Sequence, residues 1–523
     1  MPADTPQSAP PIDLLVIGGG INGAGIARDA AGRGFSVTLV ERGDLAGATS
    51  SCSSKLVHGG LRYLEQFAFR LVAESLAERE TLLRMAPHLV WPARFVMPHV
   101  PSLRPRWMIR AGLFLYDHLG GHHADSLLPG SASVRLDSGP FHAGLQDRYR
   151  HGFIYSDCRT DDARLVIANA RDATRLGARI LPRTELIAAC RSGSLWQVQL
   201  AGGEALQARA IANVAGPWVK EVLNQRLGVP SADSVRLVRG SHLVLPRLYA
   251  GEHAFILQND DRRVVFMIPY EGRFTLLGTT DVLETGDPLH PQPTAAEAAY
   301  LCAAAGRYLR QAPRPQDAVW RYAGVRPLYD DGSGDPSVIT RDYTLRLDGN
   351  EHAPVLSVFG GKLTTYRRLA EQVVDRLAVV LGPRGPAWTA QSSLPGGDMP
   401  AGGLDGFVGQ QIAPRYPWLP GSLREGLARR HGSELPDLLG DARGLEDLGE
   451  DFGGGLCERE LEWMLAREWA HCADDILWRR SKCGLHMSPQ QRERVAQRMG
   501  GQGFLRPDRG RRMAGPGVPL APH

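Results

Sequence analysis

A glycine motif near the N-terminus limits the folds open to this chain more than any other feature. Residues 12–17 (IDLLVI) are apolar apart from Asp13 and lead into Gly18-Gly-Gly-Ile-Asn-Gly23, and residues 22–33 are small and helix-favouring. Residues 36–40 (SVTLV) are expected to form a second buried strand, which ends at Glu41. This order predicts a buried strand, a glycine turn, a helix and a second parallel strand, which together make one βαβ unit.

The same motif predicts a site for the pyrophosphate of a dinucleotide. Gly18 permits the tight turn, Gly20 lets the backbone approach the pyrophosphate, and Gly23 lets the helix pack on the strand. The helix N-terminus attracts the negative charge. Glu41 can accept hydrogen bonds from ribose hydroxyls and would repel a 2′-phosphate, which argues against NADP. The alternative is a glycine turn that only packs two elements together.

Two further segments favour FAD over NAD. A Ser/Thr-rich loop, residues 48–54, follows the βαβ unit, and the distant sequence GGKLTT at 360–365 offers a second helix N-terminus. FAD is long, so its pyrophosphate and isoalloxazine ring need anchors from separate parts of the chain. The sequence has no second GxGxxG motif, so a separate NAD domain is not expected and the electron acceptor is something else.

Composition excludes several other classes of protein. The chain has 523 residues, 43% hydrophobic and 22% charged, with a net charge of +4. These values are typical of a folded protein of two or three domains and do not indicate nucleic-acid binding. The seven cysteines include no CxxC pair, so we expect reduced thiols and no metal site. Without a recognisable signal peptide or a long apolar run, no transmembrane helix is expected.

Four motifs carry a resemblance to a known family. They are SSKLVHGGLRYLE at 53–65, GTTD at 278–281, GVRPL at 324–328 and FGGKLTTY at 359–366. From about residue 13 to beyond residue 482 the chain resembles the aerobic FAD-dependent glycerol-3-phosphate dehydrogenases. The resemblance implies FAD as cofactor, oxidation of sn-glycerol 3-phosphate to dihydroxyacetone phosphate by hydride transfer, and a quinone as acceptor. It also implies a cytoplasmic protein bound peripherally to the inner face of the bacterial membrane.

The resemblance further implies an α/β fold of the D-amino-acid-oxidase type. We expect a Rossmann-like FAD-binding domain in residues 11–90, 150–225 and 335–385, interleaved with a β-sheet substrate domain in 91–149 and 226–334. Residues 386–505 are expected to form a helical C-terminal domain, and residues 1–10 and 506–523 disordered tails. A second copy of the chain, in a homodimer, is a further expected partner.

Oxidation of a phosphorylated secondary alcohol needs cations for the phosphate and a group that takes the hydroxyl proton. By resemblance, Arg62, His242, Arg326, Arg341 and Lys362 match the family's active-site positions. We expect Arg62 and Arg341 to bind the phosphate and Arg326 to orient the C2 hydroxyl. His242 is expected to act as the general base and Lys362 to lie near the flavin.

Tyr63 and His58, on either side of a Gly-Gly pair, are expected to add contacts to the substrate. Structural alternatives exist: a histidine in an apolar strand, such as His242, is often a satisfied core residue, and His58 is equally compatible with loop packing. The residues expected to contact FAD are Gly18, Gly20, Asn22, Gly23, Glu41, Thr49, Ser50, Ser51, Ser53, Ser54, Gly216, Asp281, Gly361, Lys362, Leu363 and Thr364.

Residues 107–116 (WMIRAGLFLY) combine apolar and aromatic side chains with Arg104, Arg106 and Arg110. Such a segment can lie among lipid headgroups, with its cations toward anionic lipid. The alternative is a buried helix of the substrate domain. The basic helical C-terminal domain is a second candidate for membrane contact.

Three other functions remain open. A glycerol-3-phosphate oxidase would pass its electrons to O₂, and no residue of the sequence distinguishes it. An amine or amino-acid oxidase on the same fold needs one cation for a carboxylate, whereas this chain offers several arginines. A non-enzymatic flavin-binding sensor would lack the base or the phosphate cations.

Overall fold

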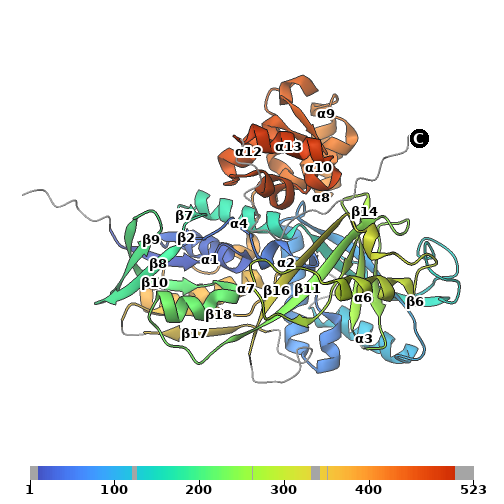
Figure 1. The fold of residues 1–523 in the computed structure, drawn as a ribbon, viewed down its shortest axis with the longest axis horizontal. Helices are drawn as coiled ribbons and strands as arrows, with labels where there is room; N and C mark the ends of the chain where they lie inside the picture. Colours follow the sequence, from blue (N-terminus) through green and yellow to red (C-terminus); the bar gives the residue numbers. More distant parts are fainter. Residues whose placement is uncertain (1–9, 121–125, 262, 331–341, 350–351, 501–523) are drawn as a thin grey trace, which may run out of the picture.

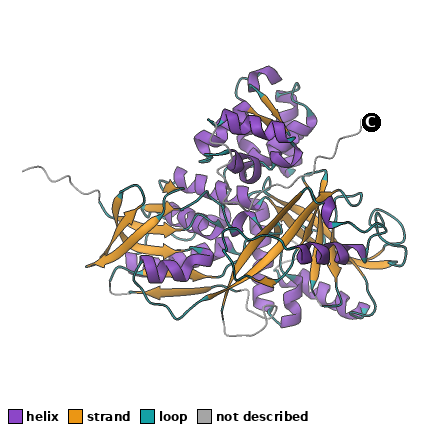
Figure 2. Ribbon diagram, viewed as in Figure 1, coloured by secondary structure: helices purple, strands orange, loops and turns teal. Residues whose placement is uncertain are grey.

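The computed structural model describes residues 10–120, 126–261, 263–330, 342–349 and 352–500. Two sheets lie next to each other in the long dimension of the molecule, and a helical C-terminal lobe stands above the helices of the first sheet (Figure 1). Figure 2 shows that helices accompany the strands in the two lower bodies, whereas the lobe is mostly helical. The expected tails lie in residues outside the described ones, apart from residue 10.

The first sheet confirms the predicted βαβ unit. Strands β1 (Ile12–Ile17) and β2 (Val37–Val40) are parallel neighbours joined by helix α1 (Ile21–Gly32). The sheet has the order β17-β18-β10-β1-β2-β7, with β9 paired to β10 and β8 to β9. Its other strands are β7 (Arg179–Leu181), β8 (Leu186–Ser192), β9 (Leu195–Leu200), β10 (Ala205–Asn213), β17 (Thr344–Asp348) and β18 (Val355–Phe359).

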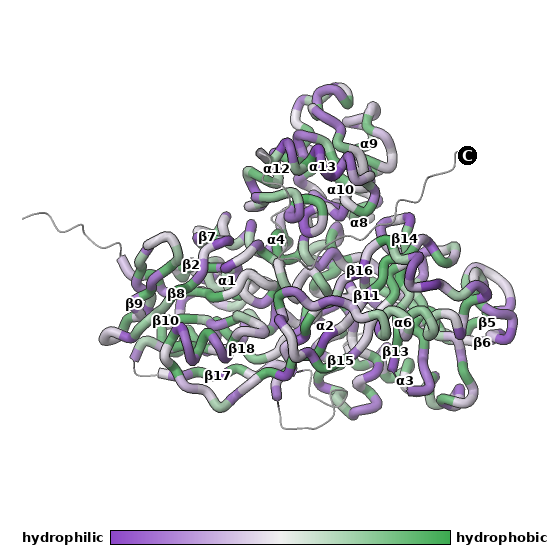
Figure 3. Tube along the Cα trace, viewed as in Figure 1, coloured by the Kyte–Doolittle hydropathy of each residue, from purple (hydrophilic) through white to green (hydrophobic). Residues whose placement is uncertain are grey.

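Small residues on α1 let two more helices approach it closely. α1 packs against both α4 (Asp162–Arg175) and α7 (Tyr366–Leu381). Ala24, Ala27 and Ala30 of α1 are fully buried. A Cβ at Gly25 would lie 2.8 Å from the ring of Tyr366. Leu14 and Val16 of β1 pack with these helices, and Leu15 and Ile17 pack in a second cluster with Trp196. Hydrophobic segments run through both lower bodies in Figure 3, as expected for strands that are covered on two faces.

The second sheet is larger and mostly antiparallel. Its order is β15-β11-β14-β13-β12-β4-β6-β3, with β16 paired to β11 and β5 to β6. Its strands are β3 (Leu56–Val57), β4 (Val90–Pro98), β5 (Ala132–Arg135), β6 (His151–Thr160), β11 (Val235–Pro246), β12 (Ala254–Gln258), β13 (Val264–Tyr270), β14 (Phe274–Gly278), β15 (Val282–Leu283) and β16 (Trp320–Tyr329).

Alternate residues of this sheet face two different cores. Leu243 of β11 packs in a cluster with α6 (Ala295–Gly306). Its neighbour Val244 packs in another cluster with α2 (Phe69–Met85) and α3 (Arg106–Leu119). The sheet is therefore covered by helices on both faces.

The strand pairings differ from the expected domain division at two places. β6 lies in the range 150–225 and β3 in the range 11–90, yet both pair within the second sheet. The Ser/Thr-rich loop expected over residues 48–54 contains a 3-10 turn, Thr49–Ser51, and is followed by the short strand β3. The chain thus crosses between the two sheets more often than the expected domain division implies.

The C-terminal lobe is built from short helices and one hairpin. The hairpin pairs β19 (Asp451–Gly453) with β20 (Leu456–Cys457). The helices are α8 (Gly403–Phe407), α9 (Ala413–Arg415), α10 (Gly421–His431), α11 (Leu435–Leu439), α12 (Glu458–Arg467) and α13 (Pro489–Arg498), with a wide helical turn at Asp475–Arg480.

Candidate active site

A cavity of about 710 Å³ is lined by residues of both sheets. Its size is in the range of pockets that hold cofactors and other small molecules. Most of the residues expected at the site meet at this cavity. Those that line it are Gly18, Gly20, Asn22, Gly23, Glu41, Thr49, Ser50, Ser53, Ser54, His58, Tyr63, Gly216, His242, Arg326, Gly361, Lys362, Leu363 and Thr364.

The other expected residues lie elsewhere. Ser51, Arg62 and Asp281 are not among the lining residues of the cavity. Arg62 belongs to the 3-10 turn Leu61–Gln66, of which the next residue does line it. Arg341 lies outside the described residues.

The glycine motif brings backbone against backbone where β1 passes into α1. Gly18 has a φ of +115°, and a Cβ on it would lie 2.6 Å from the carbonyl oxygen of Val214. A Cβ on Gly23 would lie only 1.9 Å from the carbonyl oxygen of Gly18. The hydroxyl of Ser50 accepts a hydrogen bond from the N–H of Ile21 at 3.0 Å. The bare backbone at the start of α1 therefore faces the cavity, as a site for a pyrophosphate requires.

Glu41 is fixed at the end of β2. Its carboxylate accepts hydrogen bonds from the N–H groups of Gly19 and Gly43, each at 2.7 Å. Burial raises the pKa of Glu41, against the effect of these two bonds. A carboxylate oxygen can accept more than one hydrogen bond, so the group can still receive a ribose hydroxyl.

The Ser/Thr-rich loop also uses hydroxyl groups within the protein. Thr49 donates to the carbonyl oxygen of Val325 in β16 at 2.7 Å. Ser53 donates to the carboxylate of Asp162, at the start of α4, also at 2.7 Å. These bonds tie the loop to the second sheet and to a helix of the first. The loop is thereby held in the wall of the cavity, between the second sheet and α4.

His242 is a buried histidine on β11 that reaches the cavity. The residue is 2% exposed, and its Nε2 lies 2.9 Å from Oγ of Ser54. Burial lowers the pKa of His242 well below its ordinary value, and the charges of Arg326 and Lys55 lower it further. The imidazole is therefore uncharged at neutral pH, which is the form able to accept a proton.

Arg326 reaches the same cavity from β16. Its guanidinium forms an ion pair with Asp281 and donates to Oγ1 of Thr279 at 3.0 Å. A Cβ at Gly240 would lie 2.4 Å from Nη2 of Arg326, so a larger residue there would displace the guanidinium from its present position. The ion pair with Asp281 holds the guanidinium in a set orientation, as a donor to a reacting oxygen must be held.

Lys362 connects two of the resemblance motifs. Its Nζ lies 4.1 Å from the centre of the Tyr63 ring, a cation–π contact. Close by in sequence, Oγ1 of Thr364 accepts a hydrogen bond from the N–H of His58 at 3.2 Å. The segment 360–364 is thereby attached to the segment 58–63, and both line the cavity.

A buried carboxylate behind the site escaped the sequence reasoning. Glu297 of α6 accepts hydrogen bonds from Oγ of Ser241 at 2.8 Å and from Oγ1 of Thr280 at 2.7 Å. Burial works against its ionisation, but the hydrogen bonds, led by that from Thr280, lower the pKa of Glu297 to about 2. The two donors are direct neighbours of His242 and Asp281, so Glu297 holds β11 and the segment between β14 and β15 in place. The one signal for Glu297 in the sequence is the pattern Thr294-x-x-Glu297, which predicts a capping box at the start of a helix.

The donor and acceptor set fits a dinucleotide. Oδ1 of Asn22 is buried at the cavity and has no hydrogen-bond partner among the described residues. A buried acceptor of this kind is costly unless a ligand or water donates to it. Together with the bare backbone of Gly18 and Gly23 and the carboxylate of Glu41, this atom offers FAD the contacts that the sequence predicts.

Comparison with known proteins places the chain in a class. The model of the FAD dependent oxidoreductase family, DAO, matches residues 13–367, and the chain belongs to this family. Within it, the chain is 50% identical over 491 residues to the aerobic glycerol-3-phosphate dehydrogenase of Escherichia coli (strain K12), covering 93% of this chain and 96% of that protein. The family and the cofactor expected from the motifs are thus confirmed.

Two further similarities bear on substrate and fold. The chain is 47% identical over 485 residues to the D-erythritol 1-phosphate dehydrogenase of Brucella abortus (strain 2308), covering 92% of this chain and 96% of that protein. The structure of the glycerol-3-phosphate dehydrogenase from Bacillus halodurans complexed with FAD superimposes with a TM-score of 0.68 at 25% identity, covering 95% of each chain.

Proposed function

We propose that the protein oxidises sn-glycerol 3-phosphate to dihydroxyacetone phosphate with bound FAD. One observation carries the proposal: an uncharged histidine, His242, and an oriented arginine, Arg326, meet on the wall of the cavity that also contains the glycine motif. A base and a cation beside a flavin site are what the oxidation of an alcohol needs. The similarity to glycerol-3-phosphate dehydrogenases supports the identity of the alcohol.

Each residue has a defined part in this proposal. FAD, when bound, supplies the acceptor for the hydride that leaves C2 of the alcohol. His242 takes the proton of the C2 hydroxyl at Nε2, and Arg326 stabilises the negative charge that develops on the oxygen. Lys362, on the wall of the cavity, would lie near the flavin. The phosphate and its surroundings are assigned to Arg62, Arg341, Tyr63 and His58.

D-erythritol 1-phosphate is the second candidate substrate, because a dehydrogenase of that compound is 47% identical to this chain. Both compounds are phosphorylated polyols with a secondary hydroxyl group. The same base, arginine and phosphate cations would serve either, so the difference depends on the room left for the longer carbon chain.

Anaerobic mixing of the holoenzyme with each compound separates these candidates. The visible absorbance of oxidised flavin should bleach with sn-glycerol 3-phosphate but not with glycerol or D-alanine. Faster bleaching with D-erythritol 1-phosphate at equal concentrations would instead make that compound the substrate. Bleaching by D-alanine alone would assign the site to an amino-acid oxidase.

For the acceptor we propose a membrane quinone. The competing acceptor is O₂, as in a glycerol-3-phosphate oxidase. Steady-state turnover with a soluble quinone analogue should exceed turnover in air, with little hydrogen peroxide formed. Peroxide formed in step with dihydroxyacetone phosphate would make the protein an oxidase.

We also propose α3 as a contact with the membrane surface. Trp107 and Phe114, one heptad apart on α3, are 70% and 57% exposed, and the nearby Phe67 is 78% exposed. Arg106 and Arg110 lie on the same helix. An exposed aromatic face with adjacent cations suits an anionic lipid surface. No helix among the described residues is long and apolar enough to cross a membrane.

Attachment would then be to the inner face of the cell membrane from the cytoplasm, through α3. A homodimer stays a prediction that sedimentation of the purified protein can test.

A further inference from the structure

The C-terminal lobe supplies part of the wall of the cavity. Cys472, Asp474, Asp475 and Arg479 all line it, although they lie more than 400 residues after the glycine motif. They belong to or directly precede the helical turn Asp475–Arg480. The resemblance and the sequence pattern assign these residues no part in binding.

Arg479 and its neighbour Arg480 hold the loop that follows β2. Arg479 donates to the carboxylate of Asp44 through Nε, and Arg480 donates to both oxygens of Asp44, with Nη2 at 2.8 Å. Asp44 is 5% exposed and lines the cavity three residues after Glu41. The N–H of Ala46 in the same loop donates to the carbonyl oxygen of Gly19 at 3.0 Å. The lobe is thus bonded to the loop that carries Glu41.

Asp475 makes a second attachment at the same place. Its carboxylate forms an ion pair with Arg479 and accepts a hydrogen bond from Arg183, in the turn after β7, at 2.7 Å. The N–H of Arg183 in turn donates to the carbonyl oxygen of Gly43 at 2.8 Å. The charges of the arginines lower the pKa of Asp475 in spite of its burial. All four side chains of this cluster, Asp44, Arg183, Asp475 and Arg479, line the cavity.

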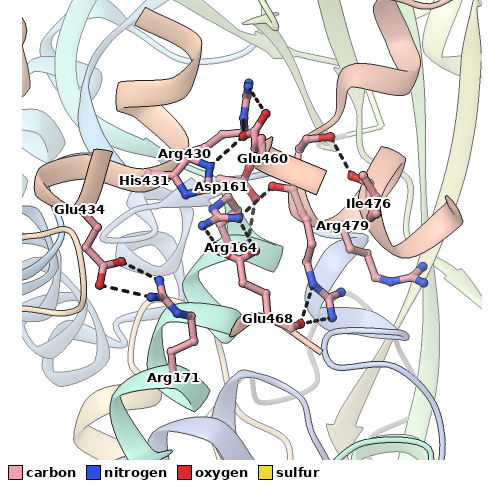
Figure 4. A network of polar contacts seen from close by, with 12 residues as sticks. Asp161, Arg164, Arg171, Arg430, His431, Glu434, Glu460, Glu468, Ile476 and Arg479 are labelled. Carbon is pink, nitrogen blue, oxygen red and sulfur yellow. Dashed lines mark hydrogen bonds and ion pairs between the residues drawn. The ribbon is translucent and has the colours of Figure 1, made fainter. Parts of the chain in front are cut away.

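Similar ion pairs join the lobe to α4 away from the cavity. Figure 4 shows Arg171 paired with Glu434 and Arg164 paired with Glu468. None of these four residues lines the cavity. The interface therefore contains matched ion pairs, some at the cavity and some remote from it.

We propose that the lobe retains the adenosine half of FAD, by fixing the loop 41–47 through the Asp44–Arg479 and Arg183–Asp475 pairs. The adenosine end is assigned because a carboxylate at the end of the second strand of a βαβ unit is where the ribose binds. The inference rests on the proposed FAD site, to which it adds residues of the C-terminal lobe that line the same cavity. If attachment of the lobe strengthens FAD binding, then FAD binding strengthens attachment of the lobe by the same free energy.

The test compares Arg479→Met with Arg171→Met in the holoenzyme. The two changes match: after Arg479→Met, Asp44 keeps Arg480 and Asp475 keeps Arg183, and after Arg171→Met, Glu434 keeps Arg175. The rate of FAD release after dilution is followed by the rise in free flavin fluorescence. Arg479→Met should release FAD at least tenfold faster than the natural protein, and Arg171→Met within twofold of it.

Arg183→Gln is a milder second variant, because the Arg183 side chain is 28% exposed. It should release FAD severalfold faster, even if Arg479→Met fails to fold. Equal release from Arg183→Gln and the natural protein would overturn the inference, as would equal acceleration by Arg171→Met and Arg479→Met. A natural protein that binds no FAD would instead overturn the proposed function.

Discussion

The imidazole ring of His242 stacks on the phenol ring of Tyr322, with centroids 4.8 Å apart and planes inclined by 16°. The hydroxyl of Tyr322 donates to the carbonyl oxygen of Ser53 at 2.8 Å. Nζ of Lys55 lies 5.2 Å from the centre of the same phenol ring. The imidazole is therefore held against a ring that is itself fixed. Its burial, together with the charges of Arg326 and Lys55, lowers its pKa and keeps it uncharged at neutral pH.

Replacement of the base should slow the reductive step without loss of the flavin. His242→Gln is expected to retain FAD and to bleach about 100- to 10,000-fold more slowly with sn-glycerol 3-phosphate, because a positioned general base contributes that much. Stopped-flow absorbance under anaerobic conditions measures the rate. The control is His253→Gln, another buried histidine, directly before β12, which does not line the cavity and should bleach at the natural rate.

The pH dependence of bleaching follows from the lowered pKa of His242. The reaction needs the uncharged imidazole, so the rate falls as the pH is lowered through the pKa of His242. That fall should occur below about pH 6.5, the ordinary value for histidine. The rate at saturating substrate is measured from neutral to acidic pH. A half-maximal point above the ordinary value would contradict the account.

Arg326 should matter for the rate and little for the cofactor. Arg326→Ala is expected to keep its flavin and to bleach about 100- to 1,000-fold more slowly, the usual loss for an oriented donor to a developing oxyanion. Arg321→Ala, on the exposed part of the same strand, is the control and should bleach normally. Unchanged bleaching in Arg326→Ala would remove the residue from the mechanism.

The glycine motif allows a pair of matched substitutions. Gly23→Ala places a Cβ 1.9 Å from the carbonyl oxygen of Gly18, so the purified variant should contain little FAD and unfold at a lower temperature. Gly112→Ala meets no atom within 4 Å on α3 and should stabilise the protein by about 0.5–1 kcal/mol. Flavin content and thermal unfolding measure both. Full flavin content in Gly23→Ala would argue against the nucleotide site.

Membrane contact through α3 predicts a specific loss. The double variant Trp107→Ser/Phe114→Ser should sediment much less with vesicles of anionic phospholipid than the natural protein does, because the exposed aromatic face is gone. Val379→Ser/Leu176→Ser removes other exposed apolar side chains, 85% and 39% exposed, and should sediment normally. Equal loss in both double variants would mean that the attachment does not depend on α3.

Local features of the fold could be predicted because their causes are local. The apolar runs around Gly18 and Glu41 match β1 and β2 closely, and the run before the GGKLTT sequence is β18. The pairing of β3 and β6 with the second sheet could not be predicted in this way. Their partners lie far along the chain, and a strand's own residues do not specify which sheet it joins.

The site shows the same limit. The glycines could be named from their spacing alone, whereas His242 and Arg326 follow from the family resemblance, and the structure brings both to the cavity wall. Glu297 and Arg479 act through contacts between distant segments. Nothing in the residues around Arg479 indicates that it reaches a loop 435 residues earlier.

One single-turnover measurement tests the central claim most directly. The holoenzyme is mixed anaerobically with excess sn-glycerol 3-phosphate, and reduced flavin and dihydroxyacetone phosphate are quantified in the same sample. The account predicts one molecule of dihydroxyacetone phosphate for each flavin reduced. Flavin that stays oxidised, or that is reduced without this product, would contradict it.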